Sequence, residues 1–377
     1  MRPPGVRVVL VGAGHAHLYV LRHAGLLRAA GVEPVLVAPP VFHYSGLATG
    51  VLSGALSADR AEIDVAALAS RFGVRHIIAE ATDVDLANKT VRLTDNQDLA
   101  FDAVSFNVGS VTTDRSGLAE EPAVWSTKPL INIIKLKDIV ESHIRDHGES
   151  PAIVVAGGGP SGFEIAAALA GLAKRRRARI CILLVTNGNA TWGPKRAITQ
   201  LIASLQRRGV VVLPGEVVER GVGICRLSDG SSLPCDMLVL ATGLSAAPVV
   251  ASLTLPLNRE GRLRVGPTLQ SIADPAVFAV GDCAVIDGAP RPAAGVFGVR
   301  AAPILLHNLA ALGSGDRMRR YAPQRRWLSI MDLGDGTGLA MRGRFWWMGR
   351  AALALKRRLD LGFIDRMRAP SGDMLQD

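Results

Sequence analysis

Short runs of apolar, mostly β-branched residues recur along this chain, and a turn signal follows each of them. The runs at 8–11 and 153–156 both lead into a glycine-rich turn and then into a stretch that favours helix. Similar runs occupy 101–107, 237–240 and 276–280. Strands that are apolar throughout are typical of parallel sheets with both faces covered. The pattern therefore predicts an α/β fold in which two strand–turn–helix units each begin a parallel sheet.

The two glycine-rich turns match the start of a dinucleotide-binding unit. The second turn has glycine at all three positions of the G-x-G-x-x-G pattern, namely Gly157, Gly159 and Gly162. Gly12 and Gly14 fill the first two positions of the first turn, and His17 stands where the third glycine would be. Glycine allows a tight turn and the close approach of a pyrophosphate, whose charge then lies at the helix N-terminus. Two such turns, one domain apart, predict two nucleotide sites.

A third segment points to a flavin. Residues 274–284 form a buried type of strand that ends in Gly281-Asp282, and an aspartate there can accept hydrogen bonds from ribityl hydroxyls. With the two turns and Ala241-Thr242-Gly243, this segment resembles the flavoproteins that have two dinucleotide-binding domains. That superfamily includes pyridine nucleotide-disulfide oxidoreductases, type II NADH dehydrogenases and sulfide:quinone oxidoreductases. The resemblance implies two Rossmann-like domains of three-layer ββα type, with the NAD(P) domain inserted in the FAD domain.

A closer resemblance is to the flavoprotein domain that is sometimes fused ahead of selenophosphate synthetase. It rests on four short segments: His-Ala-His at 15–17, Tyr-Ser-Gly at 44–46, Lys-Pro at 128–129 and Gly-Asp-Gly at 334–336. The resemblance covers nearly the whole chain and is specific for the fold and for FAD, but much less specific for the substrate. It implies FAD as the cofactor and NADPH or NADH as the electron donor.

The resemblance also implies which residues bind and react. Glu164 matches the glutamate near the nicotinamide–flavin contact of type II dehydrogenases, and it is the expected catalytic residue. A carboxylate at that depth would have a raised pKa; the alternative is a first-turn glutamate that favours the helix dipole. The expected cofactor-binding residues are Gly12, Ala13, Gly14, His15, Ala16, Tyr44, Ser45, Gly109, Gly157, Gly159, Pro160, Ser161, Gly162, Thr242, Gly243, Gly281, Asp282, Gly295 and Val296. The last two belong to a helix expected to begin within 293–300, with its N-terminus toward the flavin.

The turns divide the chain into four expected parts. These are the first part of the FAD domain (1–112), the NAD(P) domain (113–243), the second part of the FAD domain (244–314) and a basic C-terminal α+β region (315–377). Residues 151–173 are apolar enough to suggest a membrane span, but their Gly-Gly-Gly-Pro core favours a strand, a turn and a helix. The four cysteines are scattered, so neither a disulfide framework nor a metal site is expected. With no signal peptide evident, a cytoplasmic location is expected.

The positive charge is concentrated near the C-terminus. Residues 317–368 carry thirteen Arg or Lys against four Asp, a balance of +9, whereas the whole chain carries +10. Met348, Ala352, Leu355, Leu359 and Phe363 recur at helical spacing in the same segment, next to Phe-Trp-Trp at 345–347. A basic amphipathic helix with aromatic residues predicts peripheral membrane contact through 342–367, on the inner face. The alternative is a terminal helix that packs on its own domain; no motif accompanies the charge to indicate nucleic acid.

The choice of nicotinamide nucleotide stays open. An NAD site usually has Asp or Glu about 20 residues past the glycine turn, but no acidic residue lies between Glu164 and Glu216. Thr186 or Asn187 would have to contact the ribose instead. Lys195 or Arg196, at an expected helix start, could meet a 2′-phosphate, or they could simply be solvated. The site therefore favours NADPH, discriminates weakly, or no longer binds a nicotinamide.

The expected function is hydride transfer from NAD(P)H to FAD and on to a small-molecule acceptor. Quinone is expected from the basic C-terminal region rather than from a recognised pocket, because Gly295 and Arg300 replace the pattern of type II dehydrogenases. The chain lacks the cysteine pairs of sulfide:quinone enzymes and of disulfide reductases. Two alternatives stay open: a soluble flavin reductase in selenium or sulfur metabolism, and a non-catalytic flavin redox sensor. A homodimer is compatible with the sequence.

Overall fold

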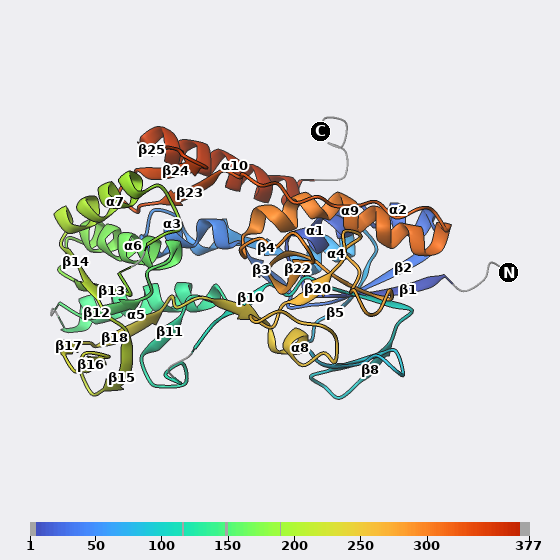
Figure 1. Cartoon of the computed structure of the whole chain (residues 1–377), viewed down its shortest axis with the longest axis horizontal. Helices are drawn as coiled ribbons and strands as arrows, with labels where there is room; N and C mark the ends of the chain where they lie inside the picture. Colours follow the sequence, from blue (N-terminus) through green and yellow to red (C-terminus); the bar gives the residue numbers. More distant parts are fainter. Residues whose placement is uncertain (1–4, 115–116, 148–149, 189, 370–377) are drawn as a thin grey trace.

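The fold consists of two lobes, each built around a parallel sheet. The computed structural model describes residues 5–114, 117–147, 150–188 and 190–369. The C-terminal elements, red in Figure 1, lie along one edge of both lobes. The predicted α/β class with two Rossmann-like domains is confirmed by this arrangement and by the parallel pairing within each main sheet.

The first domain contains a five-stranded parallel sheet with the strand order β21-β9-β1-β2-β5. Its strands are β1 (Val6–Val11), β2 (Val32–Val37), β5 (Arg75–Ile77), β9 (Ala103–Phe106) and β21 (Val277–Ala279). Successive side chains of β1 point to opposite faces, as in any strand. Leu10 packs in the core beneath the helices, whereas Val9 packs toward the antiparallel sheet β6-β7-β8. The three layers are therefore helices, parallel sheet and antiparallel sheet.

Helices α1 (His15–Arg22) and α9 (Gly295–Ser314) pack on each other over this sheet. Among the described residues, α9 is the one helix long and apolar enough to cross a membrane, yet Ala301, Leu305 and Leu309 are buried in the core of the first domain. The other elements of this domain are α2 (Ala24–Ala29), β3 (Val41–His43), η1 (Ser45–Leu47), α3 (Ala48–Leu52), η2 (Ala58–Ala61), β4 (Glu62–Asp64), α4 (Val65–Arg71), β6 (Ala81–Asp85), β7 (Thr90–Leu93), β8 (Asp98–Ala100), α8 (Pro248–Ala251), β20 (Leu263–Val265), η3 (Gly281–Cys283) and β22 (Ala284–Ile286).

The second domain repeats the plan with the strand order β11-β18-β12-β13-β14. Its sheet consists of β11 (Val124–Ser126), β12 (Ala152–Ala156), β13 (Cys181–Thr186), β14 (Val210–Pro214) and β18 (Met237–Leu240), with helices α5 (Ile131–His147), α6 (Pro160–Arg176) and α7 (Lys195–Arg207) and a small sheet of β15 (Val217–Gly221), β16 (Ile224–Leu227) and β17 (Ser232–Pro234). The apolar segment 151–173 is a strand, a turn and a helix, as predicted.

A two-stranded ribbon connects the domains. Strand β10 (Ser110–Thr112) pairs antiparallel with β19 (Leu244–Ala246), and Thr112 lies opposite Leu244. The chain thus leaves the first domain and returns to it along the same ribbon. The predicted boundaries at 112/113 and 243/244 both lie at the Thr112–Leu244 end of this pairing.

The C-terminal region differs from the predicted amphipathic helix. It forms the antiparallel sheet β23 (Ser329–Asp332), β24 (Gly338–Arg342) and β25 (Phe345–Gly349), followed by α10 (Arg350–Arg368). Met348, predicted to belong to the helix, therefore lies in a strand together with the Phe-Trp-Trp segment. Ala352 and Phe363 are buried within the protein, because α10 packs on β23 and β24 and reaches β4 and α1. Only part of the predicted apolar stripe faces outward, including Leu359 at 51 % exposed.

Candidate active site

The second glycine turn is shaped for a nucleotide. A Cβ on Gly157 (φ +145°) would collide with the carbonyl oxygen of Ala241, and one on Gly162 would collide with the carbonyl oxygen of Gly157. At Gly159 a Cβ would meet nothing within 4 Å, so the backbone there is open to an approaching ligand. Pro160 begins α6, where its missing N–H costs nothing. The turn therefore keeps its tight bend and its exposed helix N-terminus for a pyrophosphate.

The residues at the end of β13 and after it support this turn. They do not include the acidic residue that an NAD site usually has for the ribose. Trp192 donates its indole N–H to the carbonyl oxygen of Gly158 at 2.8 Å. A Cβ on Gly158 would lie 3.2 Å from Thr186 Cβ and 3.5 Å from Asn187 Oδ1, so both predicted ribose contacts lie beside the turn. Lys195 and Arg196 are exposed at the start of α7 and directly follow Pro194, which lines the large cavity described below, but they do not line it themselves.

The first glycine turn is closed by Asn107. Its Oδ1 accepts from the backbone N–H groups of Ala16 at 2.9 Å and His17 at 3.1 Å, and its own amide donates to Val280 O at 2.8 Å. A Cβ on Gly14 would strike the Asn107 side chain, which explains the glycine there. The N–H of Ala16, a residue predicted to bind the cofactor, is thus occupied by Asn107 in this structure.

His17 replaces the third glycine with a structural role. The ring is fully buried, with Nδ1 2.6 Å from Gly12 O and Nε2 2.8 Å from Ser105 Oγ. Burial lowers the pKa of His17 to about 4, so the ring is neutral near pH 7. Because the facing residue on β9 is the small Ser105, the strand leaves space for the His17 ring. Glycine at position 17 is therefore not needed for close packing of helix and strand.

The substitution His17→Ala should lower the free energy of unfolding by roughly 2–3 kcal/mol, because it opens a cavity and removes the partners of Gly12 O and Ser105 Oγ. Urea unfolding followed by circular dichroism measures the loss. His307→Ala is the matched control, since that ring makes one exposed hydrogen bond to Arg317 O. Equal stability of the two variants would contradict the role given to His17.

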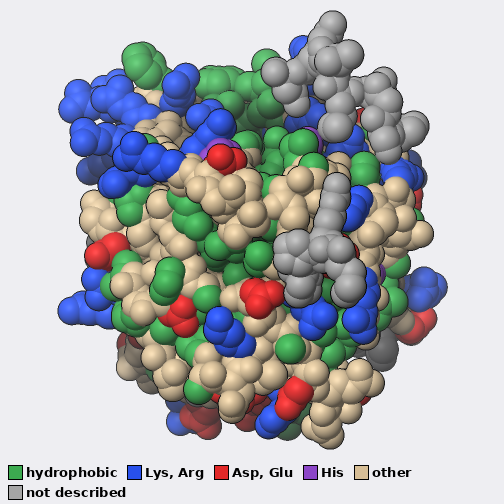
Figure 2. All heavy atoms as spheres, turned by 90° about the vertical axis from the view of Figure 1, so that its right-hand side faces the viewer, with side chains coloured by type: hydrophobic (Ala, Val, Ile, Leu, Met, Phe, Trp, Pro, Cys, Tyr) green, Lys and Arg blue, Asp and Glu red, His purple; other side chains and the backbone are tan. Residues whose placement is uncertain are grey.

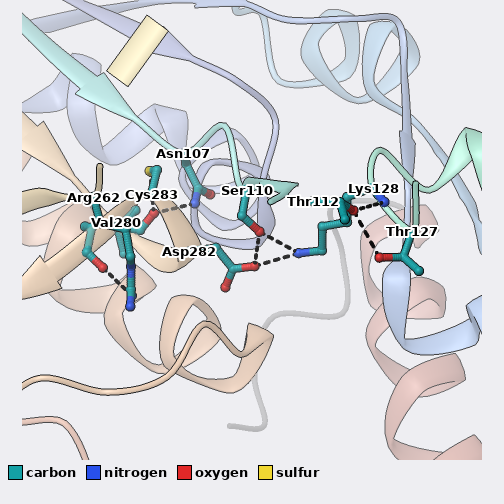
Figure 3. Close-up of polar contacts among 10 residues, drawn as sticks. Asn107, Ser110, Thr112, Thr127, Lys128, Arg262, Val280, Asp282 and Cys283 are labelled. Carbon is teal, nitrogen blue, oxygen red and sulfur yellow. Dashed lines mark hydrogen bonds and ion pairs between the residues drawn. The ribbon is translucent and has the colours of Figure 1, made fainter. Parts of the chain in front are cut away.

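Lys128 joins the second domain to the predicted flavin aspartate. Its Nζ lies 2.7 Å from Asp282 Oδ2 and 2.9 Å from Ser110 Oγ, and Ser110 Oγ donates to Asp282 Oδ2 at 3.0 Å (Figure 3). Burial alone would raise the pKa of the Asp282 carboxyl, but Lys128 and Ser110 hold it below its usual value. A half-buried, ionised carboxylate beside a polar cavity fits the ribityl hydroxyls of FAD, which are hydrogen-bond donors.

An aromatic cluster surrounds His15. Its ring centroid lies 5.4 Å from Phe42, 5.3 Å from Tyr44 and 5.3 Å from Phe363 on α10. Burial lowers the pKa of His15 to about 4, although Asp282 acts in the opposite direction. The imidazole is therefore neutral near pH 7 and offers a flat, weakly polar surface next to Gly295, the first residue of α9.

Glu164 lies where three parts of the chain meet. Its Oε1 accepts from the backbone N–H of Asp332 at 3.1 Å and from Thr49 Oγ1 at 3.5 Å. Burial raises the pKa of Glu164 to about 7, and the positive charge of Lys356 limits the rise. The carboxyl group can therefore gain or lose a proton near neutral pH, which a general acid or base requires.

Helix α10 supplies the charge that faces Glu164. Lys356 Nζ pairs with Asp360 Oδ2 at 3.0 Å, and both side chains are nearly buried. Tyr44 donates its hydroxyl to Asp360 Oδ1 at 2.9 Å. Burial opposes the charge on Lys356, but Asp360 and Glu164 together raise its pKa above the usual value. The network thus runs from the aromatic cluster through Asp360 and Lys356 toward Glu164.

A cavity of about 1320 Å³ extends from the second glycine turn to Asp282. Seven predicted cofactor residues line it: Gly157, Gly159, Pro160, Ser161, Thr242, Gly243 and Asp282. The turn at 12–16 does not line it, and Gly281 lines a smaller cavity instead. The large space therefore connects the second glycine turn with the predicted flavin aspartate, Asp282.

The remaining predicted residues lie around the first domain. Tyr44 and Ser45 precede and begin η1, Gly109 (φ +74°) lies between β9 and β10, and Gly295 and Val296 begin α9. Cys283 is buried, donates to Val280 O at 3.3 Å and has a pKa raised to about 11 by burial, so it is a packing residue. Within the residues that the structure describes, His, Cys, Asp and Glu form no metal-binding group.

The sequence did not point to Asn107, Lys356 and Asp360 as site residues. The i,i+4 spacing of Lys356 and Asp360 is a signal for a pair on one helix face, but it does not show that this face is buried. Asn107 is the last residue of the predicted strand at 101–107 and directly follows β9 in the structure, a position where polar side chains often serve a site.

Comparison with known proteins agrees with this geometry. The pyridine nucleotide-disulphide oxidoreductase family matches residues 6–302. Demethylphylloquinone reductase NdbB of Synechocystis is 27 % identical over 73 % of this chain and 71 % of its own length, and type II NADH:quinone oxidoreductase NdhA of Mycobacterium tuberculosis is 25 % identical over 83 % and 74 %. Ferroptosis suppressor protein 1 of Taeniopygia guttata is 24 % identical over 94 % and 93 %.

Two solved structures share the fold. Sulfide:quinone oxidoreductase from Aquifex aeolicus superposes with a TM-score of 0.78 at 17 % identity, covering 97 % of this chain and 92 % of its own. NDH2 from Plasmodium falciparum, in complex with NADH, gives 0.78 at 14 % identity, covering 98 % and 100 %. The predicted enzyme class and the pairing of FAD with NADH or NADPH agree with the matched family. The chain belongs to the pyridine nucleotide-disulphide oxidoreductase family.

Proposed function

We propose that this protein oxidises NADPH or NADH through FAD and reduces a quinone. The observation that carries the proposal is the continuous cavity that joins the second glycine turn to Asp282, with Glu164 on the helix that follows the turn. Quinone reductases among the relatives, by their printed names, support the choice of acceptor. FAD, when bound, supplies the electron transfer that no amino-acid side chain provides.

Side chains of the protein deliver the proton that quinone reduction requires. Reduction of a quinone takes up two electrons and two protons. The hydride of the nicotinamide carries both electrons and one proton, so a group near the flavin must deliver one further proton from solvent. Glu164, with a pKa of about 7, suits that role, and Lys356 and Asp360 hold a fixed charge pair beside it. The positive charge of Lys356 favours the ionised carboxylate after each proton leaves.

Anaerobic titration tests the proposal directly. The purified yellow protein is mixed with NADPH or with NADH while the flavin absorbance near 450 nm is followed, and a short-chain quinone is then added. Bleaching by a nicotinamide followed by recovery with quinone supports the proposal. Bleaching without recovery would exclude quinone and favour the alternative, a soluble reductase in selenium or sulfur metabolism. A flavin that neither nucleotide bleaches would leave the redox sensor.

We further propose that the protein contacts the inner face of a membrane through β25 and the outer side of α10. Phe345 is 78 % exposed and Trp347 40 % exposed, and Leu359 lies on the outer side of the helix. Arg344, Arg350 and other arginines lie near them in sequence. In Figure 2, Lys and Arg side chains gather beside exposed hydrophobic ones at the top, the edge along which α10 runs in Figure 1. Aromatic residues with arginines suit an anionic lipid surface.

The double substitution Phe345→Ser and Trp347→Ser should weaken binding to vesicles that contain anionic lipid by at least about tenfold, because two large apolar side chains no longer enter the interface. Co-sedimentation with phosphatidylglycerol vesicles measures the binding. Val222→Ser, which alters a fully exposed apolar residue of the second domain, is the control. Membrane contact elsewhere is indicated if the double variant binds as well as the control.

A further inference from the structure

Two arginines on the wall of the large cavity have no assigned role. Arg325 and Arg326 line the same cavity as the second glycine turn, together with Trp327 and Ser329. They belong to the segment between α9 and β23, outside both Rossmann-like sheets. The residues Lys195 and Arg196, which the sequence suggested as phosphate contacts, do not line this cavity.

The backbone on both sides of the two arginines is held in place. Arg291 donates to the carbonyl oxygen of Gln324 at 3.1 Å and to that of Pro323 at 3.3 Å. On the other side, the Trp327 ring lies edge-on against Phe297 at 5.2 Å. The two guanidinium groups are thus attached to a fixed segment, which lowers the entropy cost of using them in binding.

The two side chains are available to a ligand. Both arginines are exposed, and neither guanidinium has an ion-pair or hydrogen-bond partner among the residues that the structure describes. The other two arginines of the cavity are occupied, because Arg262 and Arg291 donate to backbone carbonyl oxygens. Three carboxylates line the wall, and one of them, Asp282, is neutralised by Lys128. The other two, Glu216 and Glu260, face four lining arginines, so the wall carries an excess of positive charge toward an anionic ligand.

The segment also lies close to the wall formed by the glycine turn. A Cβ on Gly343 would lie 3.6 Å from Arg326 Cδ, so Arg326 packs against the β24–β25 hairpin. Met341, near the turn of that hairpin, packs against Gly193, next to the Trp192 that holds the glycine turn. The arginines are therefore placed on the side of the cavity from which a nucleotide on the turn would be covered.

We infer that Arg325 and Arg326 bind phosphate oxygens of the nicotinamide nucleotide, closing the donor site from the C-terminal region. The inference rests on the proposed function, since it requires NADPH or NADH in this cavity. Arginine presents a planar fork of donors that matches phosphate oxygens, and the N-terminus of α6 supplies the opposite set of N–H groups. The shared ligand chemistry is a phosphate ester, either the pyrophosphate common to both nucleotides or the 2′-phosphate of NADPH.

The test compares nucleotide binding in matched double variants of the holoenzyme. Arg325→Ala with Arg326→Ala removes the two cavity arginines, and Arg342→Ala with Arg344→Ala removes two exposed arginines that flank Gly343 but do not line the cavity. Dissociation constants for NADP⁺ and NAD⁺ are measured by quenching of tryptophan fluorescence, since Trp192 and Trp327 line the cavity. The turnover number at saturating donor is measured alongside.

In the cavity variant, the dissociation constant of NADP⁺, or of both NADP⁺ and NAD⁺, should rise at least about tenfold, while the turnover number at saturating donor changes little. In the control variant, both dissociation constants should change less than about twofold. Weaker binding of both nucleotides means that the arginines contact the pyrophosphate. Weaker binding of NADP⁺ alone means that they contact the 2′-phosphate. Restoring charge with Arg325→Lys and Arg326→Lys should recover part of the affinity. Unchanged affinity in the cavity variant overturns the inference. Wild-type protein that binds neither nucleotide would refute the proposed function itself, and this inference with it.

Discussion

Glu164→Gln is expected to lower the turnover number with quinone on the order of 10²-fold, the usual contribution of a positioned general acid or base. Glutamine keeps the acceptor oxygen for the Asp332 N–H and Thr49 Oγ1, so the local structure is retained while the titratable proton is lost. The half-reaction with NADPH or NADH should change much less than turnover, because only the acceptor step takes up protons. Stopped-flow bleaching and steady-state turnover separate the two steps.

The pH profile gives the same prediction a second readout. With a pKa of about 7, Glu164 is protonated below neutral pH and ionised above it. If the protonated form delivers the proton, the turnover number of the wild type falls as pH rises through 7, and the Gln variant lacks this inflection. The raised pKa also means that the free energy of unfolding falls as pH rises toward 7, a slope that the variant should lose.

Glu260→Gln is the matched control, since Glu260 is an exposed carboxylate that lines the large cavity. It should leave both the turnover number and the pH profile nearly unchanged. If Glu164→Gln keeps full turnover and the inflection near pH 7, then Glu164 is a helix-start glutamate and the proton comes from elsewhere.

Local signals were enough to predict the two nucleotide-binding units. Gly157 and Gly162 each have the close backbone contact that the pattern implies, and the apolar runs became the strands of two parallel sheets. The sequence patterns that predicted these features involve residues only a few positions apart. His17 shows the limit of such signals, because its partner Ser105 lies on another strand, 88 residues away.

The C-terminal helix shows why the rest could not be predicted. The sequence suggested an apolar stripe through Ala352, Leu355 and Leu359, with lysine and arginine facing solvent. In the structure the inward stripe contains Lys356 and Asp360 together with Ala352 and Phe363. A prediction from periodicity assumes that the buried face of a helix is apolar. It therefore selects the wrong face when the buried face carries an ion pair that contacts polar groups from distant segments.

Asp282→Ala is expected to yield protein that retains less than about a tenth of its FAD, because charge-assisted hydrogen bonds contribute roughly 1.5–3 kcal/mol each. Loss of the carboxylate also leaves Lys128 partly buried and uncompensated, which adds to the cost of binding. The ratio of flavin to protein absorbance measures the FAD content, and titration of the apoprotein with FAD gives the dissociation constant. Asp287→Ala breaks the equally short but exposed pair with Arg264 and should keep its FAD.

A second variant separates the two causes of the loss. In Asp282→Ala combined with Lys128→Met, the unpaired charge is gone but the ribityl acceptor is still missing. Continued loss of FAD in this double variant means that Asp282 binds the cofactor. Recovery of FAD means instead that Asp282 serves to neutralise Lys128, and the sequence-based assignment of Gly281-Asp282 to the ribityl chain is then wrong. Lys128 belongs to the second domain. Recovery would therefore also show that the chain needs an aspartate at position 282 for the contact between the domains rather than for the flavin.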